Sequence, residues 1–292
     1  MNQIVGRLSV GAEVILGTDM DDYIRPLGGS DIIDGKKGFD TVFVFWPTSK
    51  FKITTISGIT YLDAVSGASR SDKLTLQNVE AIEFSDGVVS LEIPDTFLNT
   101  TGKDAFIGGP GIDTVIYSGN SNEYVVLPSE FGIDVSSANF SESPDWLRTI
   151  ERLQFKDKGL AFDLEGHAGT AAKTLSLVFG ISSVYLPDYV GICLDLLDNK
   201  SYKPEQLMQA ALNVRLGADA IDPGKVVDFL YAQLTGGGLP SASDKAAYVD
   251  LILNKTYSIE GLAVAAAELS LNPIAPSLVG LATSGLPFIL PS

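Results

Sequence analysis

The chain has 292 residues, enough for one large or two medium domains with a buried core. Apolar residues make up 45% of it and 29 residues are glycine, a globular composition that excludes long disordered stretches. Acidic residues outnumber basic ones by 36 to 20, and the net charge of −16 argues against nucleic acid and anionic membranes as partners and in favour of divalent cations.

Export and membrane signals are scarce along the chain. The opening residues MNQIVGRLSVGAEVILG contain one arginine and an interrupted apolar run, so we expect no Sec-type leader. No apolar stretch reaches the ~18 residues that a spanning helix needs, so we expect no transmembrane segment.

Nine-residue units recur in two blocks. They read GTDMDDYIR, PLGGSDIID and GKKGFDTVF from Gly17, then NTTGKDAFI and GGPGIDTVI from Asn99. The sixth residues are all aspartate, namely Asp22, Asp31, Asp40, Asp104 and Asp113. The eighth residues are all apolar, namely Ile24, Ile33, Val42, Phe106 and Val115. The fourth residue is Met20 in the first unit and glycine in the others, namely Gly29, Gly38, Gly102 and Gly111.

This pattern resembles the RTX, or hemolysin-type, calcium-binding repeat G-G-x-G-x-D-x-U-x. Glycine permits positive φ in a tight loop, aspartate supplies a hard oxygen, and the apolar eighth residue opens a short strand facing the core. The resemblance implies that two units complete one coil, so that loops two units apart lie on the same edge and share a calcium ion.

Carried over to this chain, the resemblance places Asp22 beside Asp40. Backbone carbonyls would complete that calcium site, from residues Gly17, Asp19, Lys36 and Gly38. Asp31 lies on the opposite edge with no complete unit after it, and Asp104 and Asp113 lie on opposite edges of a two-unit block, so these three look like half-sites. The alternative is that the units are plain turns, because Asp and Gly favour turns without any metal.

A larger repeat of about 72 residues encloses the small one. Asp40 matches Asp113 and Glu80 matches Glu151, and the alternating segments FKITTISGITYL and AIEFSDGVVSLEI predict β-hairpins. We interpret the acidic residues of these hairpins as solvated turn and edge charges rather than ligands; they are Glu80, Asp86, Glu151 and Asp157. The sequence therefore predicts two modules, at 1–94 and 95–166, each a β-roll fragment with a β-hairpin sheet.

Residues 167–292 lack strand-like alternation and contain several helix start and stop signals, so this part is predicted to be helical. Predicted helices include AGTAAKTLSLVFG ending at Gly180, KPEQLMQAALNVRLG ending at Gly217, and DPGKVVDFLYAQL capped by Asp222. An internal repeat pairs Tyr202 with Tyr257.

This part resembles an uncharacterised helical domain found after hemolysin-type repeats in secreted bacterial proteins. Its apolar end, GLATSGLPFILPS, is similar in position to the uncleaved signal of type I secretion. The expected fold class is α+β and multidomain, with two β modules before an all-α bundle.

Catalytic motifs are lacking, so we expect no enzyme. His167 is the single histidine, which makes an H-E-x-x-H site impossible, and a linker or capping role suits its position in LEGHAGT. The single cysteine, Cys193, lies in an apolar run and predicts a buried small hydrophobe. Trp46 and Trp146 suggest a carbohydrate contact, although packing inside the hairpins is the simpler expectation.

The leading functional hypothesis is a secreted, calcium-binding structural protein. It would fold on calcium outside the cell and self-assemble coil to coil at the cell surface as a layer, filament or adhesive matrix. The alternative is an export, stability or carbohydrate-binding accessory module of a secreted hydrolase system, with cell-surface polysaccharide as a possible partner.

Overall fold

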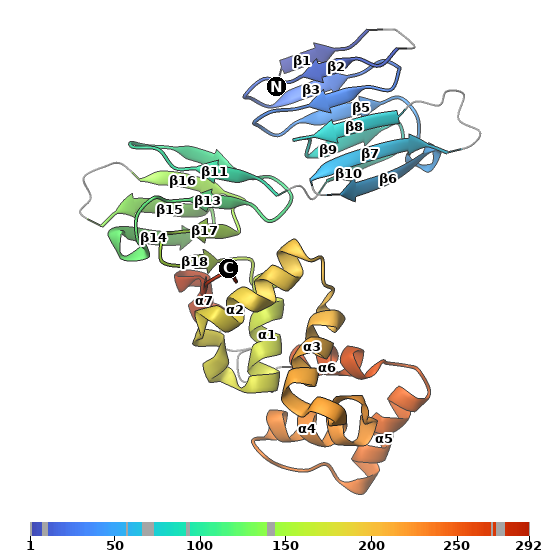
Figure 1. The fold of residues 1–292 in the computed structure, drawn as a ribbon, viewed down its shortest axis with the longest axis vertical. Helices are drawn as coiled ribbons and strands as arrows, with labels where there is room; N and C mark the ends of the chain where they lie inside the picture. The colour runs from blue at the N-terminus through green and yellow to red at the C-terminus, as the bar shows by residue number, and fades with distance from the viewer. Residues whose placement is uncertain are drawn as a thin grey trace. The chain divides into compact units, whose positions relative to one another are not determined.

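We describe the fold from a computed structural model of the chain (Figure 1). The structure describes residues 2–7, 11–56, 58–65, 73–91, 94–138, 144–269, 271–272 and 278–291. The chain forms two compact units. The first holds Met1–Ile116, Phe131–Ile133 and Glu142–Ile150, and the second holds Tyr117–Glu130, Asp134–Ser141 and Glu151–Ser292. The division predicted from the sequence, two β modules at 1–94 and 95–166 and a helical domain at 167–292, stays a prediction.

Successive strands near the N-terminus alternate between two sheets of the first unit. One sheet has the order β1 (Asn2–Val5), β3 (Asp22–Arg25), β5 (Thr41–Val44), β9 (Ala81–Phe84) and β10 (Gly87–Ser90). The other has the order β2 (Val14–Leu16), β4 (Ile32–Asp34), β8 (Lys73–Gln77), β7 (Ile59–Ala64) and β6 (Phe51–Ile56). Parallel pairing places Ile24 opposite Val42 and Ile15 opposite Ile33. The chain thus returns to the same sheet after two nonapeptides, as the repeat predicts.

The inner faces of these two sheets share one apolar core. The eighth residues of the first three nonapeptides, Ile24, Ile33 and Val42, have no exposed surface, because alternation along a strand turns them all inward. The predicted hairpins are confirmed: β6 pairs antiparallel with β7, and β9 with β10. The sequence did not predict β8, which pairs with β4 from across the chain.

The second block of nonapeptides repeats this arrangement. Strand β11 (Thr96–Leu98) pairs in parallel with β13 (Thr114–Ile116), and β12 (Ala105–Ile107) pairs in parallel with β16 (Asp145–Arg148) in a different sheet. Two short 3-10 turns mark the tandem duplication. Asp86 accepts hydrogen bonds from the Thr48 N–H and hydroxyl at η1 (Thr48–Lys50), and Asp157 does so from Ser121 at η2 (Ser121–Glu123).

The remaining elements lie mostly in the second unit. The strands are β14 (Tyr124–Ser129), β15 (Gly132–Ser137), β17 (Arg152–Gln154) and β18 (Gly159–Ala161). The helices are α1 (His167–Phe179), α2 (Pro187–Leu194), α3 (Pro204–Leu216), α4 (Pro223–Thr235), α5 (Ala242–Leu253), α6 (Ile259–Ala267) and α7 (Leu278–Ser284), with short turns η3 (Ile181–Tyr185), η4 (Asp195–Asn199) and η5 (Gly217–Ile221) between them.

The helix boundaries agree with the stop and start signals. Helix α1 ends at Gly180 and α3 at Gly217, both with positive φ, and Asp222 accepts the Gly224 and Lys225 N–H groups at the start of α4. The internal repeat is also confirmed, because the Tyr202 and Tyr257 N–H groups bond carbonyls six residues earlier in equivalent turns. The described residues form both sheets and helices, so the fold class is α+β, whereas the β-roll form of the two modules stays a prediction. No helix within the described ranges is both long and apolar enough to cross a bilayer.

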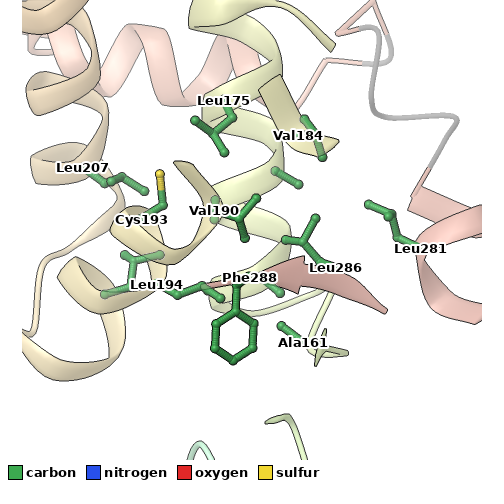
Figure 2. Packing of buried hydrophobic residues seen from close by; sticks show 14 residues of the cluster. Ala161, Leu175, Val184, Val190, Cys193, Leu194, Leu207, Leu281, Leu286 and Phe288 are labelled. Carbon is green, nitrogen blue, oxygen red and sulfur yellow. The ribbon is translucent and has the colours of Figure 1, made fainter. Parts of the chain in front are cut away.

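The C-terminal segment departs from the helical prediction. Residues 286–288 form strand β19 (Leu286–Phe288), which pairs antiparallel with β18. Figure 2 shows Leu286 and Phe288 among Val190, Leu194 and Ala161 in the core of the second unit. Apolar composition alone cannot distinguish a buried edge strand from an export signal, so a signal role stays a prediction.

Candidate functional site

Three acidic side chains are stacked along one edge of the first unit, at the starts of the neighbouring strands β3, β5 and β9. The Asp22 N–H donates to Asp40 Oδ1 at 2.8 Å, and the Asp40 N–H donates to Glu80 Oε2 at 2.6 Å. Asp22 and Asp40 have no exposed surface and Glu80 has 1%. Asp40 and Glu80 thus each accept a backbone N–H from the preceding acidic residue of the stack, whereas Asp22 accepts from Thr18 of its own unit. The predicted proximity of Asp22 and Asp40 is confirmed, and the structure adds Glu80.

The burial of Glu80 corrects the sequence interpretation of a solvated edge charge. Parallel pairing of β5 with β9 places Ala81 opposite Thr41, so Glu80 occupies the next rung after Asp40. That pairing joins segments about 40 residues apart in the chain, which a local pattern does not reveal. The exposed turn positions of Asp86 and Asp157 agree with the sequence interpretation, whereas Glu151 is half-buried.

A glycine adjoins each aspartate on this edge. A Cβ at Gly35 would overlap both Asp40 Oδ2 and the Asn78 carbonyl oxygen, and a Cβ at Gly17 would overlap the Gly35 carbonyl and lie 2.9 Å from Asp22 Oδ2. Asn78 has a φ of 50°, a left-handed conformation. Each glycine therefore leaves room for a carboxylate oxygen and a carbonyl oxygen from the next coil to approach each other.

The second block repeats this cradle. A Cβ at Gly108 would overlap Asp113 Oδ2 and the Thr149 carbonyl oxygen, and Thr149 has a φ of 47°. The fourth-position glycines all have positive φ, as the repeat requires, with values of 118° at Gly29, 120° at Gly38, 111° at Gly102 and 135° at Gly111.

Asp40 carries the clearest electrostatic imbalance of the site. Its Oδ2 atom is buried and has no hydrogen-bond partner within the described ranges. Burial raises the pKa of Asp40 to about 8, and burial likewise raises the pKa of Glu80 to about 7. An unpaired charge in such a position is unfavourable, so these oxygens require either a proton or a cation.

Asp22 is better satisfied than Asp40. Its Oδ2 accepts from the Thr18 N–H at 2.6 Å, and the Thr18 hydroxyl lies 3.1 Å from both of its oxygens. Thr100 contacts Asp104 in the same way, because threonine replaces the second-position glycine in both units. The threonine thus supplies locally the donors that Asp40 lacks.

The other three predicted aspartates also face acidic residues. The Glu13 N–H donates to Asp31 at 3.0 Å, the Asp95 N–H to Asp113 at 2.7 Å and the Asp104 N–H to Asp145 at 2.9 Å. The nonapeptide pattern does not predict Glu13, Asp95 and Asp145 as partners of these aspartates. Each stands two residues before an apolar residue of a strand, which is the spacing of the repeat, but the glycines that mark a full unit are incomplete. The apparent half-sites therefore have acidic neighbours within the chain.

The remaining predicted ligands lie in the loops. Asp19 and Lys36 are exposed, Lys36 has a φ of 81°, and its ammonium group contacts Asp34 at 2.5 Å. A Cβ at Gly38 would meet the backbone of Met20 and Asp21 at 2.6 Å, so loops of neighbouring coils touch there. Carbonyl ligation by Gly17, Asp19, Lys36 and Gly38 stays a prediction. The carbonyl oxygens that border the two carboxylates in the structure belong to Gly35 and Asn78.

Calcium suits the chemistry of this donor set. Within the described ranges, no three His, Cys, Asp or Glu side chains converge as a metal-binding group, so a site here would combine carboxylate with backbone oxygens. Calcium accepts such mixed, all-oxygen coordination, whereas zinc prefers nitrogen and sulfur. The buried Oδ2 of Asp40 and the adjacent carbonyl of Asn78 are oxygen donors, so they suit calcium better than zinc.

The single histidine belongs to an ion network in the second unit. Arg152 bonds Asp163 and Asp198, and His167 Nδ1 lies 2.7 Å from Asp198 Oδ1. The hydrogen bond to Asp198 raises the pKa of His167. Burial raises the pKa of the Cys193 thiol to about 12, consistent with its predicted role as a small hydrophobe.

Comparisons with known proteins find little similarity. No protein family and no curated protein matches the chain. Among solved structures, the extracellular lipase LipA of Serratia marcescens is similar at 11% identity, with a TM-score of 0.17. The match covers 51% of this chain and 38% of the lipase chain. Likeness at this level carries no argument about fold or activity.

Proposed function

We propose that this protein is a secreted, calcium-binding structural protein whose nonapeptide coils form RTX-like β-rolls and take up calcium outside the cell. The observation that carries the proposal is the buried Asp40 Oδ2, which lacks a hydrogen-bond partner among the described residues and borders the space at Gly35 together with the Asn78 carbonyl oxygen. Bound calcium would neutralise the carboxylates on this edge and join consecutive coils.

The residues of the acidic edge would have different roles in calcium binding. Asp40 and Asn78 would hold the ion, Asp22 and Gly35 would hold a second ion one coil earlier, and Glu80 fixes the Asp40 backbone through its 2.6 Å hydrogen bond. Residues 1–166 contain 25 acidic and 13 basic residues. Mutual repulsion among these charges opposes folding, so calcium binding would favour the compact state.

A calcium titration of the full chain tests the proposal. We expect millimolar calcium to raise the melting temperature of the EDTA-treated protein and Asp40→Asn to remove most of that increase. Asp86→Asn is the matched control, because Asp86 is an exposed acid of the same module that bonds Thr48. A wild-type protein with the same melting temperature and circular dichroism in EDTA and in calcium would falsify the proposal.

We further propose that calcium-loaded chains self-assemble at the cell surface, reached by a type I export route. Strands β1 and β2 are the outermost strands of their sheets, so each leaves one backbone edge open for pairing. Near these edges Val14, Leu16 and Ile32 are 66, 56 and 49% exposed. Exposed apolar residues beside an open strand edge favour association of copies.

Light scattering at several calcium levels tests the assembly. We expect the mean mass to rise with calcium, and Leu16→Lys to hold the protein monomeric while calcium still raises its melting temperature. Lys50→Glu, a charge change at η1, is the control. A strict monomer at every calcium level would refute assembly and leave calcium binding intact.

A further inference from the structure

A cleft of about 530 Å³ opens in the first unit beside Arg25 and Val44, the last residues of β3 and β5. It lies between the loop Pro26–Gly29 and the segment Phe43–Trp46, with Phe51 and Leu74 as further walls. Its size falls within the roughly 300–1,000 Å³ that is typical of small-molecule sites. Arg25 is the one charged residue among its lining residues within the described part of the chain.

The aromatic residues at its mouth are exposed. Phe45 is 72% exposed and Trp46 is 42% exposed, and their rings meet edge to face at 5.7 Å. Packing of Trp46 inside the hairpin, the simpler expectation from sequence, is therefore wrong. Trp146, by contrast, is half-buried beneath Arg148, whose guanidinium lies 4.3 Å from its ring centre.

The outer face of the adjoining sheet extends this surface. Alternation places Tyr23, Arg25 and Phe43 outward while Ile24 and Val42 face the core. The Arg25 guanidinium lies 5.3 Å from the Tyr23 ring centre and 5.2 Å from that of Phe43, and Tyr23 donates a hydrogen bond to Glu83 at 2.9 Å. Rigid strands thus hold rings beside a cation whose N–H groups lie in a plane.

From this geometry we infer that the cleft binds polysaccharide, with Trp46 and Phe45 stacking on the apolar C–H faces of pyranose rings and Arg25 donating to their oxygens. A sugar ring has apolar faces and a rim of hydroxyl groups, which matches exposed rings next to a five-donor guanidinium. The net charge of −16 repels nucleic acids and anionic lipids, and a purely apolar ligand would leave the donors of Arg25 without acceptors.

Tryptophan fluorescence gives a direct assay, because the chain has two tryptophans. In a Trp146→Phe background, Trp46 is the single reporter. The probes are hexamers of β-glucan, of mannan and of polygalacturonate, which separate neutral from acidic sugars. We expect a saturable change in Trp46 emission with at least one of the two neutral hexamers and none with polygalacturonate, because the net charge of −16 repels a polyanion. A signal with polygalacturonate alone would overturn the assignment.

Calorimetric titration with the same hexamers locates the site. We expect Phe45→Ala and Trp46→Ala each to weaken binding by about tenfold or more, and Arg25→Gln to weaken it as well. Tyr248→Ala, which removes an exposed ring of α5, is the control and should leave binding unchanged.

The inference is overturned if no hexamer produces a saturable signal, if binding survives Trp46→Ala, or if the emission changes only with phosphatidylcholine vesicles. Calcium-dependent melting of each variant separates this result from the proposed calcium role, because the cleft lining in the described part of the chain does not include Asp22, Asp40 or Glu80. Loss of sugar binding with calcium stabilisation intact points to the cleft alone.

Discussion

At the scale of single residues, the difference between Asp22 and Asp40 decides which site depends most on a cation. Both side chains are buried at equivalent places of the repeat, but Thr18 donates to Asp22 whereas Asp40 Oδ2 has no hydrogen-bond partner in the part of the chain that the structure describes. A buried acceptor without a donor destabilises the fold by about 1–3 kcal/mol or more. The Asp40 cradle therefore has more to gain from a bound ion than the Asp22 cradle.

The glycine beside Asp40 should not tolerate a side chain. In Gly35→Ala the new methyl group would overlap Asp40 Oδ2 and the Asn78 carbonyl, so the two oxygens could no longer approach a common ion. We expect a loss of about 1–3 kcal/mol from overpacking, together with a weaker response to calcium. Urea unfolding with and without calcium measures both effects.

Gly11→Ala is the matched control for this substitution, because a Cβ there meets no atom within 4 Å. A Gly35→Ala protein that is as stable and as calcium-responsive as Gly11→Ala would show that the cradle is a turn without metal.

At the scale of elements, the C-terminal strand β19 packs into the helical core and stabilises it. Phe288 is 3% exposed, and a Cβ at Gly159 on β18 would overlap its ring. We expect Phe288→Ala to lower the free energy of unfolding of the second unit by about 3–5 kcal/mol, since the cavity would be enclosed by several elements. Ile289→Ala, at a 44% exposed neighbour, should change it by less than about 0.5 kcal/mol. Equal effects of the two substitutions in chemical unfolding would contradict the docking of β19.

The network that joins β17, α1 and η4 predicts a pH dependence. Asp198, Asp163 and Arg152 surround His167, and the hydrogen bond to Asp198 raises the pKa of His167. A raised pKa in the folded state means that protonation stabilises the fold. This stabilisation is complete below the unfolded pKa of about 6.5 and is lost as the pH rises through the higher folded value.

Urea midpoints of the helical signal between about pH 5.5 and pH 8.5 measure this effect. The wild type should lose stability across that range and His167→Gln should lose less. The measurement should be made in saturating calcium, so that titration of Asp40 and Glu80 in the first unit does not contribute to the pH dependence of stability. A wild type and a His167→Gln variant with parallel pH profiles would rule out the network as the cause.

Local patterns were sufficient to predict most elements. The helices from α1 to α6 follow from apolar periodicity and from caps such as Asp222, and the hairpins follow from two-residue alternation. Partners brought together over long sequence separations were not predictable in this way. Glu80 joins Asp40, and Asp145 joins Asp104, through strand pairings that no nonapeptide frame marks. Strand β19 was missed because an apolar tail carries no partner information.

At the scale of the whole molecule, calcium should act on one unit and leave the other unchanged. The five aspartates of the nonapeptides all belong to the first unit, whereas the helical core and the network of Arg152 belong to the second. One site held at 100 times its dissociation constant contributes about 2.7 kcal/mol, and 1 kcal/mol moves the melting temperature of a domain of this size by roughly 2–8 °C.

Differential scanning calorimetry of the full chain should therefore show two transitions in EDTA. Calcium should raise the one that belongs to the first unit by about 5 °C or more and leave the other in place. Asp40→Asn should reduce the shift, and Phe288→Ala should lower the calcium-insensitive transition alone, which assigns each peak to its unit. If calcium raises both transitions equally, or if one transition covers the whole chain at every calcium level, stabilisation does not arise at the acidic edge of the first unit.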